Sequence, residues 1–262
     1  MKKLKRISQW LAIGTIALAV ASISATWLQQ RQRHADASGE AIAATASDAS
    51  LAIEQGQFLV LRPRGRPERM GVIVYPGAYV DIRGYVPTLR PIAAAGYRVV
   101  VVPMPFELAI FGINSALDVE AANPDIKRWA IIGHSVGGAM AALFAGRHVD
   151  ATEGLIIWDS YPPSAAHLGD FPKPVWLIHR ATPNGEPPAS FSNNRYLFPR
   201  DSHWVPIPGG IHMYFGSFVG GGYVEDWAPN IDRAQQRRLV VAATIQALAQ
   251  IDALSLATRV AQ

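Results

Sequence analysis

The sequence contains no cysteine among its 262 residues. This absence excludes a disulfide framework, a thiolate metal site and a cysteine nucleophile. Charged residues are also scarce, at 17%, while half of the residues are hydrophobic, which excludes both a disordered chain and a coiled coil. The length fits one α/β domain or two small domains, and it is sufficient to bury a sizeable core.

Most of the chain has no excess of basic residues, although the net charge is +4. Six of the 24 basic residues lie within residues 1–34, which contain no acidic residue. The rest of the chain is mildly acidic, so we expect no nucleic-acid partner. The sequence also lacks a GxGxxG motif and any His, Asp and Glu at metal-binding spacing. We therefore expect no cofactor and no metal.

A long uncharged segment lies between Arg6 and Arg31. Its apolar part, Trp10 to Leu28, would span roughly 28 Å as a helix, close to the thickness of a bilayer core. More basic residues precede this segment than follow it, which favours a cytoplasmic N-terminus. We therefore expect residues 1–34 to form a membrane anchor that contacts the lipid bilayer through residues 7–28. The rest of the chain would then lie on the extracytoplasmic side.

Two alternatives to an anchor remain open for this segment. Ala19-Val20-Ala21 has the small residues of a signal-peptide cleavage site, in which case the protein would be exported after cleavage. The apolar run is long for a signal peptide, because it continues to Leu28. The other alternative is a buried core helix. Residues 35–50 are small and polar, so we expect a linker there, followed by a folded domain over residues 51–262.

Short apolar runs alternate with helical stretches from about residue 51 onward. Continuous apolar runs of this kind suit strands buried on both faces of a parallel sheet. The alternation predicts an α/β fold with right-handed βαβ units and helices on both faces of a mostly parallel sheet. In such sheets ligands bind at the carboxyl ends of the strands. The runs are Gln57–Arg62, Met70–Tyr75, Tyr97–Val102, Trp129–Ile132, Gly154–Trp158, Pro174–Ile178 and, less regular, His203–Ile207.

A candidate nucleophile follows the run Trp129–Ile132. The next residues are Gly-His-Ser-Val-Gly-Gly, and a helical stretch comes directly after them, so G-x-S-x-G stands between a strand and a helix. Glycines two positions before and after Ser135 are required, because side chains there would collide with neighbouring elements. The helix N-terminus behind Ser135 favours negative charge. We predict that Ser135 is the nucleophile and that His134, which points elsewhere, is a packing residue.

Four stretches of the sequence resemble a known family. The matching stretches are Val74–Ala78, Val102–Phe106, Gly133–Gly138 and Gly209–His212, spread over roughly residues 57–250. They are similar to α/β-hydrolases, in particular to the small, lidless kind represented by dienelactone hydrolases and to a bacterial subgroup of that superfamily. The resemblance implies an α/β-hydrolase fold with no large lid, here preceded by one N-terminal hydrophobic helix.

The resemblance also implies roles for individual residues. The oxyanion hole would be formed by the backbone N–H groups of Val136 and Ala78. The order of catalytic residues in the superfamily places the histidine last, which points to His212 as the base. The acid usually follows the strand before the last one, but here Asn184-Gly185 stands where relatives carry Asp-Gly. That departure leaves the identity of the acid open.

Asp159 is our leading candidate for the acid. It follows the apolar run that ends at Trp158, where a bare carboxylate needs a partner, and some lipases carry their acid at this earlier strand. Glu186 is a second candidate. In a third alternative there is no acid and Asn184 takes its place, and an asparagine can orient an imidazole but cannot balance its charge.

These residues predict a serine hydrolase that cleaves small esters or lactones through an acyl-enzyme on Ser135. The loop Ser160 to Lys173 is too short for a lid domain, so we expect an open or shallow site. We interpret Gly220-Gly221-Gly222 as a flexible loop, because no helix follows it at phosphate-loop spacing. The alternative, motivated by Asn184, is a catalytically inactive hydrolase fold that serves as a binding module of the cell envelope. The sequence assigns no oligomeric state.

Overall fold

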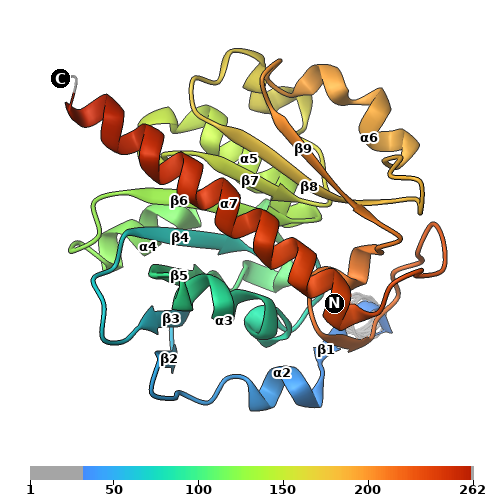
Figure 1. Cartoon of the computed structure of the whole chain (residues 1–262), viewed down its shortest axis with the longest axis horizontal. Helices are drawn as coiled ribbons and strands as arrows, with labels where there is room; N and C mark the ends of the chain where they lie inside the picture. Colours follow the sequence, from blue (N-terminus) through green and yellow to red (C-terminus); the bar gives the residue numbers. More distant parts are fainter. Residues whose placement is uncertain (1–31, 261–262) are drawn as a thin grey trace, which may run out of the picture.

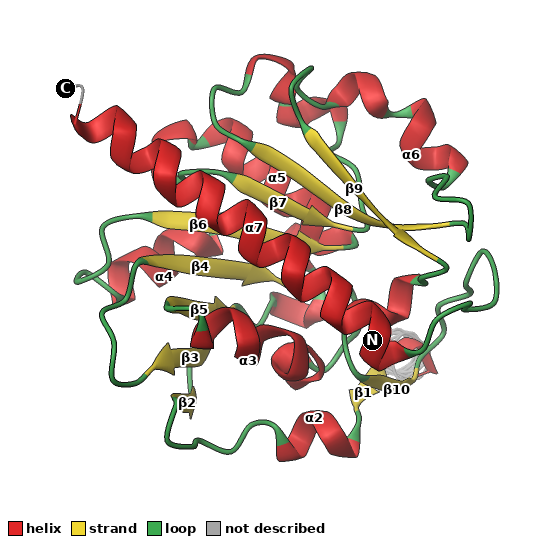
Figure 2. Cartoon of the chain, viewed as in Figure 1, coloured by secondary structure: helices red, strands yellow, loops and turns green. Residues whose placement is uncertain are grey.

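The computed structural model describes residues 32–260 and contains an eight-stranded sheet with the strand order β2-β3-β5-β4-β6-β7-β8-β9 (Figures 1 and 2). The strands β2 and β3 at one edge pair antiparallel, β3 is also antiparallel to β5, and the other neighbouring strands are parallel. The predicted mostly parallel sheet is therefore confirmed. The strands are β2 (Leu51–Gln55), β3 (Leu59–Pro63), β4 (Met70–Tyr75), β5 (Tyr97–Val101), β6 (Trp129–His134), β7 (Leu155–Trp158), β8 (Val175–Ala181) and β9 (His203–Pro208).

Helices cover both faces of this sheet, as the alternating sequence pattern predicts. Figure 1 shows α7 and α3 in front of the strands and α4 and α5 behind them. The side chains of β4 alternate accordingly: Val72 and Val74 belong to one core cluster, and Ile73 and Tyr75 belong to the other. Both faces are buried, which explains why β4 is apolar without interruption. The helices are α3 (Val86–Ala94), α4 (Ser115–Ala122), α5 (Val136–Arg147), the short α6 (Ala189–Asn193) and α7 (Arg233–Val260).

The predicted element boundaries hold best where strands are fully buried. β4 matches its predicted run at both ends. β2, a half-exposed strand at the edge of the sheet, was not predicted, because its residues Leu51–Gln55 lack a continuous apolar run.

The expectation of a linker over residues 35–50 is wrong. The strand β1 (Ala35–Ala37) pairs antiparallel with β10 (Phe218–Gly220). Ala35 is almost fully buried, donates its N–H to the carbonyl of Tyr79 at 2.8 Å and accepts the N–H of Asp81 at 2.9 Å. A small side chain is what allows this strand to approach the loop so closely. Of the three glycines interpreted as a flexible loop, Gly220 is the last residue of β10, and Gly221 and Gly222 follow it outside the strand.

The short helix α2 (Gly39–Ala43) continues this folded segment. The Ser38 side chain caps it by accepting a hydrogen bond from the N–H of Ala41, and Ala41 is completely buried. The large apolar residue of this segment, Ile42, is exposed, but Ala35 and Ala41 are buried and Ala44 packs against the core. It therefore belongs to the domain and does not connect to it as a spacer.

The predicted anchor or signal, including residues 7–28, lies outside the described residues. Within the described part, α7 is long and apolar enough to cross a membrane by length and composition. Half of the relevant stretch is buried, however, and Val240, Leu248 and Ile251 belong to the core. We therefore interpret α7 as a core helix of the sheet.

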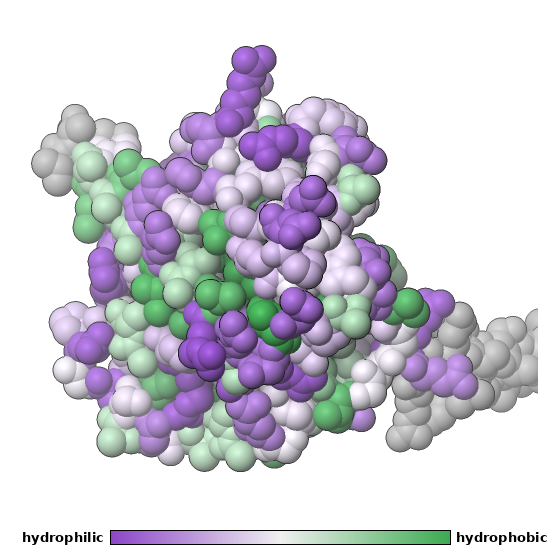
Figure 3. Space-filling view, turned by 45° about the vertical axis from the view of Figure 1, so that its right-hand side comes forward, coloured by the Kyte–Doolittle hydropathy of each residue, from purple (hydrophilic) through white to green (hydrophobic). Residues whose placement is uncertain are grey.

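Several large hydrophobic side chains stay exposed on loops at the carboxyl edge of the sheet. Phe106 and Phe111, on the loop after β5, are 74% and 59% exposed. Val219, Tyr223 and Val224, in and after β10, are 50%, 43% and 84% exposed. In Figure 3, which turns the right-hand side of Figure 1 forward, hydrophobic residues in green stand between purple polar ones. This edge also carries the residues predicted to be catalytic.

Candidate active site

Ser135 occupies a strained turn between β6 and α5. Its backbone angles are φ 55° and ψ −128°, a conformation that L-residues rarely adopt. A Cβ on Gly133 would lie 2.3 Å from the carbonyl oxygen of Gly137, and one on Gly137 would lie 2.3 Å from the carbonyl oxygens of Tyr75 and Pro76. The prediction that both glycines are required is confirmed. The turn places Ser135 at the carboxyl end of β6.

Asp159 and His212 meet beside this turn. Asp159 follows β7 directly, and His212 begins the 3-10 turn His212–Phe215 after β9. The Oδ2 atom of Asp159 lies 2.5 Å from Nδ1 of His212, and both residues are almost completely buried. With Nδ1 donating to the carboxylate, Nε2 is the nitrogen that remains available to accept a proton.

Ser135 and His212 line the same two cavities, of about 380 and 350 Å³. Among the described residues no hydrogen bond joins the Ser135 hydroxyl to the His212 ring. Such bonds are often long in hydrolases without substrate and tighten when the substrate binds. The residues predicted as nucleophile, base and acid are thus brought to one place at the carboxyl edge.

Arg180 is a buried cation at this site that sequence reasoning missed. Its Nη1 donates to Oδ2 of Asp159, its backbone N–H donates to Oδ1 of Asp159 at 2.8 Å, and its Nη2 donates to Oδ2 of Asp226 at 2.6 Å. The guanidinium also lies 5.5 Å from the ring centre of Phe191 and 5.6 Å from that of Trp227. The available signal was its position after the apolar run of β8, since a buried arginine requires a carboxylate partner.

Hydrogen bonds and charges from His212 and Arg180 determine the ionisation of Asp159. Burial by itself would raise the pKa of this carboxyl group. The hydrogen bond and charge of His212, the charge of Arg180 and the backbone N–H of Arg180 outweigh burial and lower the pKa to about 2. Asp159 is therefore a carboxylate at neutral pH. It can hold the His212 ring in one tautomer and stabilise its protonated form.

The segment that follows β10 fixes the position of His212. The ring of Tyr223 stacks on the His212 ring at a centroid distance of 4.1 Å. The Glu225 carboxylate accepts the backbone N–H groups of His212 and Met213, each at 2.8 Å. These contacts hold His212, and the ion pair between Asp226 and Arg180 ties the same segment to the site. Sequence reasoning missed all three residues, because their loop shows no motif.

The two predicted oxyanion donors lie in the same cavity as Ser135. Ala78 and Val136 both line it, and in the described part of the chain their backbone N–H groups have no hydrogen-bond acceptor. The loop of Ala78 is held by its neighbour Gly77, whose N–H donates to the Tyr85 hydroxyl at 2.9 Å. A developing oxyanion requires two free N–H groups close to the reacting carbonyl.

His134 packs beneath the site, as predicted, and also makes a hydrogen bond. Its Nδ1 lies 2.8 Å from the Tyr85 hydroxyl, which links the nucleophile turn to the loop of Gly77. The ring lies 4.5 Å from the His212 ring and 5.4 Å from the Phe215 ring. Burial, assisted by the nearby His212, lowers the pKa of His134 well below its ordinary value, so this ring is neutral at neutral pH.

The alternative acids lie away from His212. Asn184 and Glu186 are exposed in a turn after β8, which is closed by a 2.8 Å hydrogen bond from the N–H of Thr182 to the carbonyl of Glu186. Neither side chain contacts the histidine. The structure thus brings Asp159, and not these two residues, to the base.

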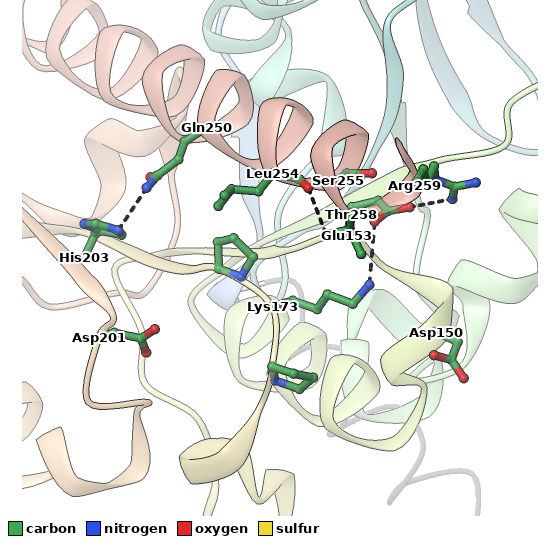
Figure 4. Close-up of a pocket in the computed structure, with 12 residues that line it drawn as sticks. Asp150, Glu153, Lys173, Asp201, His203, Gln250, Leu254, Ser255, Thr258 and Arg259 are labelled. Atoms are coloured by element: carbon green, nitrogen blue, oxygen red, sulfur yellow. Dashed lines mark hydrogen bonds and ion pairs between the residues drawn. The ribbon is translucent and has the colours of Figure 1, made fainter. Parts of the chain in front are cut away.

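A larger cavity lies at the opposite edge of the sheet. It measures about 640 Å³ and is lined by polar residues near the amino ends of β7 and β8 and by the C-terminal part of α7 (Figure 4). Glu153 pairs there with Arg259 at 2.9 Å and with Lys173 at 3.6 Å. This cavity is therefore distinct from the site of Ser135. Within residues 32–260 no group of three or more His, Asp or Glu side chains could hold a metal ion.

The sequence matches the model of the Alpha/beta hydrolase family over residues 71–237, which is more than half of the chain. The protein therefore belongs to this family and is a hydrolase by family. The matched stretch contains Ser135, Asp159 and His212, and also the loop of Gly77 and Ala78. A comparison with curated protein sequences finds no match.

Solved structures with the same fold have diverse activities. A soluble variant of monoglyceride lipase from Saccharomyces cerevisiae is 12% identical with a TM-score of 0.54, and the match covers 79% of this chain and 97% of the lipase. A ferulic acid esterase from Streptomyces cinnamoneus is 19% identical with a TM-score of 0.54, with 72% and 68% covered. Proline iminopeptidase from Mycobacterium smegmatis is 14% identical with a TM-score of 0.53, with 79% and 100% covered. At these identities the likeness concerns the fold.

Proposed function

We propose that this protein is a serine hydrolase that cleaves carboxylic esters or lactones through an acyl-enzyme on Ser135. In the proposal His212 is the general base, Asp159 orients it and balances its charge, and the N–H groups of Val136 and Ala78 hold the oxyanion. The body is tethered to the membrane by residues 7–28, or exported after cleavage of the N-terminal segment. Lactones are included as substrates because the sequence resembles dienelactone hydrolases.

The reaction would proceed in two halves. The Ser135 oxygen attacks the carbonyl carbon while its proton moves to Nε2 of His212, and the negative oxygen of the tetrahedral intermediate is held by the two N–H groups. The carbon–oxygen bond to the alcohol then breaks, and the alcohol takes the proton from His212. Water attacks the acyl-enzyme in the same way and releases the acid and Ser135. Each oxyanion donor of this kind stabilises the transition state by about 3–4 kcal/mol.

The buried contact between Asp159 and His212 is the observation that carries this proposal. An inactive binding module would have no need to keep a carboxylate and an imidazole desolvated at 2.5 Å from each other beside a strained serine. The inactive alternative is based on Asn184, which stands where relatives carry the acidic residue. Its exposed position, away from the base, leaves that alternative without support from the site geometry.

The test is covalent labelling with a fluorophosphonate probe, followed by intact mass of the full chain in detergent. Wild type should gain one adduct, whereas Ser135→Ala should gain none. His212→Ala and Asp159→Asn should label much more slowly, and Glu186→Gln should label at the wild-type rate. A folded wild type that takes no label would refute the hydrolase proposal and favour the binding module.

A further inference from the structure

We infer that the ester substrate of this site is an amphiphile with a fatty acyl chain that is held in the bilayer, not a freely soluble ester. This inference rests on the proposed function and on the predicted anchor. It begins with the mouth of the cavity that Ser135 and His212 share. Arg33 and Ala35 line that cavity, so the first described residues after the apolar segment form part of the entrance.

These residues are fixed in place. β1 is held on one side by its pairing with β10 and on the other by the hydrogen bonds of Ala35 with Tyr79 and Asp81. Next to them, Nδ1 of His34 lies 3.0 Å from Oε2 of Glu107, on the loop after β5. The chain therefore enters the domain between two loops of the active-site edge. The orientation of the cavity mouth is coupled to the direction from which the chain arrives.

The length of the chain limits how far this entrance can move from a bilayer. Ala35 at the cavity lies seven positions after Leu28, where the apolar run ends. Even fully extended, this stretch reaches at most about 25 Å. If residues 7–28 are in the bilayer, the mouth stays within about 25 Å of the point where the chain leaves it.

The loops on both sides of the entering chain carry exposed hydrophobic side chains, and we call these side chains the rim. Phe106 and Phe111 contact each other at a centroid distance of 5.6 Å on the loop that also carries Glu107. Val219 and Val224 lie in and after β10, on the other side of β1. Exposed apolar and aromatic side chains on loops beside a site fit a lipid surface better than water. The rim would let a fatty acyl chain pass from the bilayer to Ser135 without crossing water.

The experiment compares a bilayer-held ester with a soluble one. The full chain is reconstituted in vesicles of dialkyl ether phosphatidylcholine, which contain no carboxylic ester of their own. A fluorogenic monoacylglycerol analogue or a fluorogenic lysophosphatidylcholine is added to the vesicles, and p-nitrophenyl acetate is the soluble ester. We expect kcat/KM for at least one lipid ester to exceed that for the soluble ester by about 100-fold, and the two headgroups distinguish a neutral from a phosphate-bearing substrate.

Two double variants separate the rim from general effects on the fold. Phe106→Asp/Phe111→Asp places charges on the rim and should lower hydrolysis of the lipid ester at least tenfold, with hydrolysis of p-nitrophenyl acetate unchanged. The matched control, Leu254→Asp/Leu256→Asp, changes two half-exposed leucines of α7 far from the site and should alter neither rate. Inserting twelve Gly and Ser residues after Gln30 should also lower only the lipid rate, while the same insertion after Lys5 should not.

The inference is overturned if the rim variant keeps the wild-type ratio of lipid to soluble hydrolysis, or if wild type does not prefer a bilayer-held ester. It is also overturned if intact mass shows that the mature protein has lost residues 1–21. Failure of the proposed function looks different, because the wild type would then hydrolyse neither ester and take no fluorophosphonate label.

Discussion

The Oδ2 atom of Asp159 and the Nδ1 atom of His212 lie 2.5 Å apart, although 53 residues separate them in the chain. Parallel strands explain this contact, because the carboxyl ends of β7 and β9 reach the same edge of the sheet with only β8 between them. Arg180, at the end of β8, lies between the two and neutralises the carboxylate from the other side. Asp159, His212 and Arg180 thus form one network, in which the loss of any one side chain changes the electrostatic environment of the other two.

The first prediction concerns the triad acid. Asp159→Asn keeps the shape of the side chain but removes the charge that stabilises the protonated base, and it allows the wrong tautomer of His212. We expect kcat to fall by about 10⁴-fold with little change in KM. Steady-state hydrolysis of p-nitrophenyl acetate measures both. Glu186→Gln is the matched control, and its kcat should stay within about twofold of the wild-type value. An equal loss of kcat in both variants would contradict the assignment of Asp159 as the acid.

The second prediction concerns Arg180. Arg180→Met retains much of the side-chain volume but leaves Asp159 without its buried counter-charge, and breaking a buried pair in this way costs about 3–5 kcal/mol of unfolding free energy. Asp226→Asn removes the half-exposed partner of the same arginine and should cost less than about 1 kcal/mol. Urea unfolding followed by tryptophan fluorescence compares the two variants. Similar losses in both would show that the Asp159 pair is not the dominant one.

The third prediction separates a positioning role from a structural one. Tyr85→Phe removes the hydroxyl that accepts the N–H of Gly77 and bonds to His134, leaving buried polar groups unpaired at a cost of about 1–3 kcal/mol. Because Gly77 precedes the proposed oxyanion donor, we also expect slower acylation by the fluorophosphonate probe.

Tyr75→Phe is the matched control for this variant. The Tyr75 hydroxyl bonds to the carbonyl of Ile113 and the N–H of Ala116, both at 2.8 Å, on the other face of the sheet. It should lose a similar amount of stability and label at the wild-type rate. If Tyr85→Phe also labels at that rate, Tyr85 is a structural residue and does not position the oxyanion loop.

The fourth prediction concerns the tight approach of the nucleophile turn to the oxyanion loop. In Gly137→Ala the new Cβ would lie 2.3 Å from two backbone oxygens, so one of the two loops must move. We expect loss of fluorophosphonate labelling together with a lower melting temperature. Gly169→Ala, where a Cβ meets nothing within 4 Å, should be neutral in both measurements. Normal labelling of Gly137→Ala would contradict the required geometry.

The fifth prediction is a pH dependence of stability that comes from Asp159. Its pKa is about 2 in the folded protein and 3.8 ordinarily, so the folded state favours the carboxylate. The resulting stabilisation, about 2 kcal/mol, is complete above the ordinary value and is lost as the pH falls through 2. The difference in unfolding free energy between wild type and Asp159→Asn should therefore shrink between pH 5 and pH 2. A difference that stays constant over this range would contradict the shifted pKa.

The sequence by itself determined the features that depend on local chemistry. Buried strands such as β4 need an uninterrupted apolar run, because both of their faces are covered. The turn at Ser135 needs glycines at Gly133 and Gly137, because backbone atoms of neighbouring elements come within 2.3 Å of where a Cβ would be. These requirements act on adjacent residues, and they can therefore be recognised without knowing the path of the chain.

Only the tertiary structure decided which acid meets the histidine and that residues 35–50 belong to the domain. Asp159 and Glu186 both follow strands, and their sequence contexts allowed either role; the curve of each loop places one beside His212 and turns the other toward solvent. Likewise, Ala35 is a small residue in a polar stretch, and only the approach of β10 and the Tyr79 loop buries it. Contacts between residues far apart in sequence depend on strand order and loop path, which composition and periodicity do not encode.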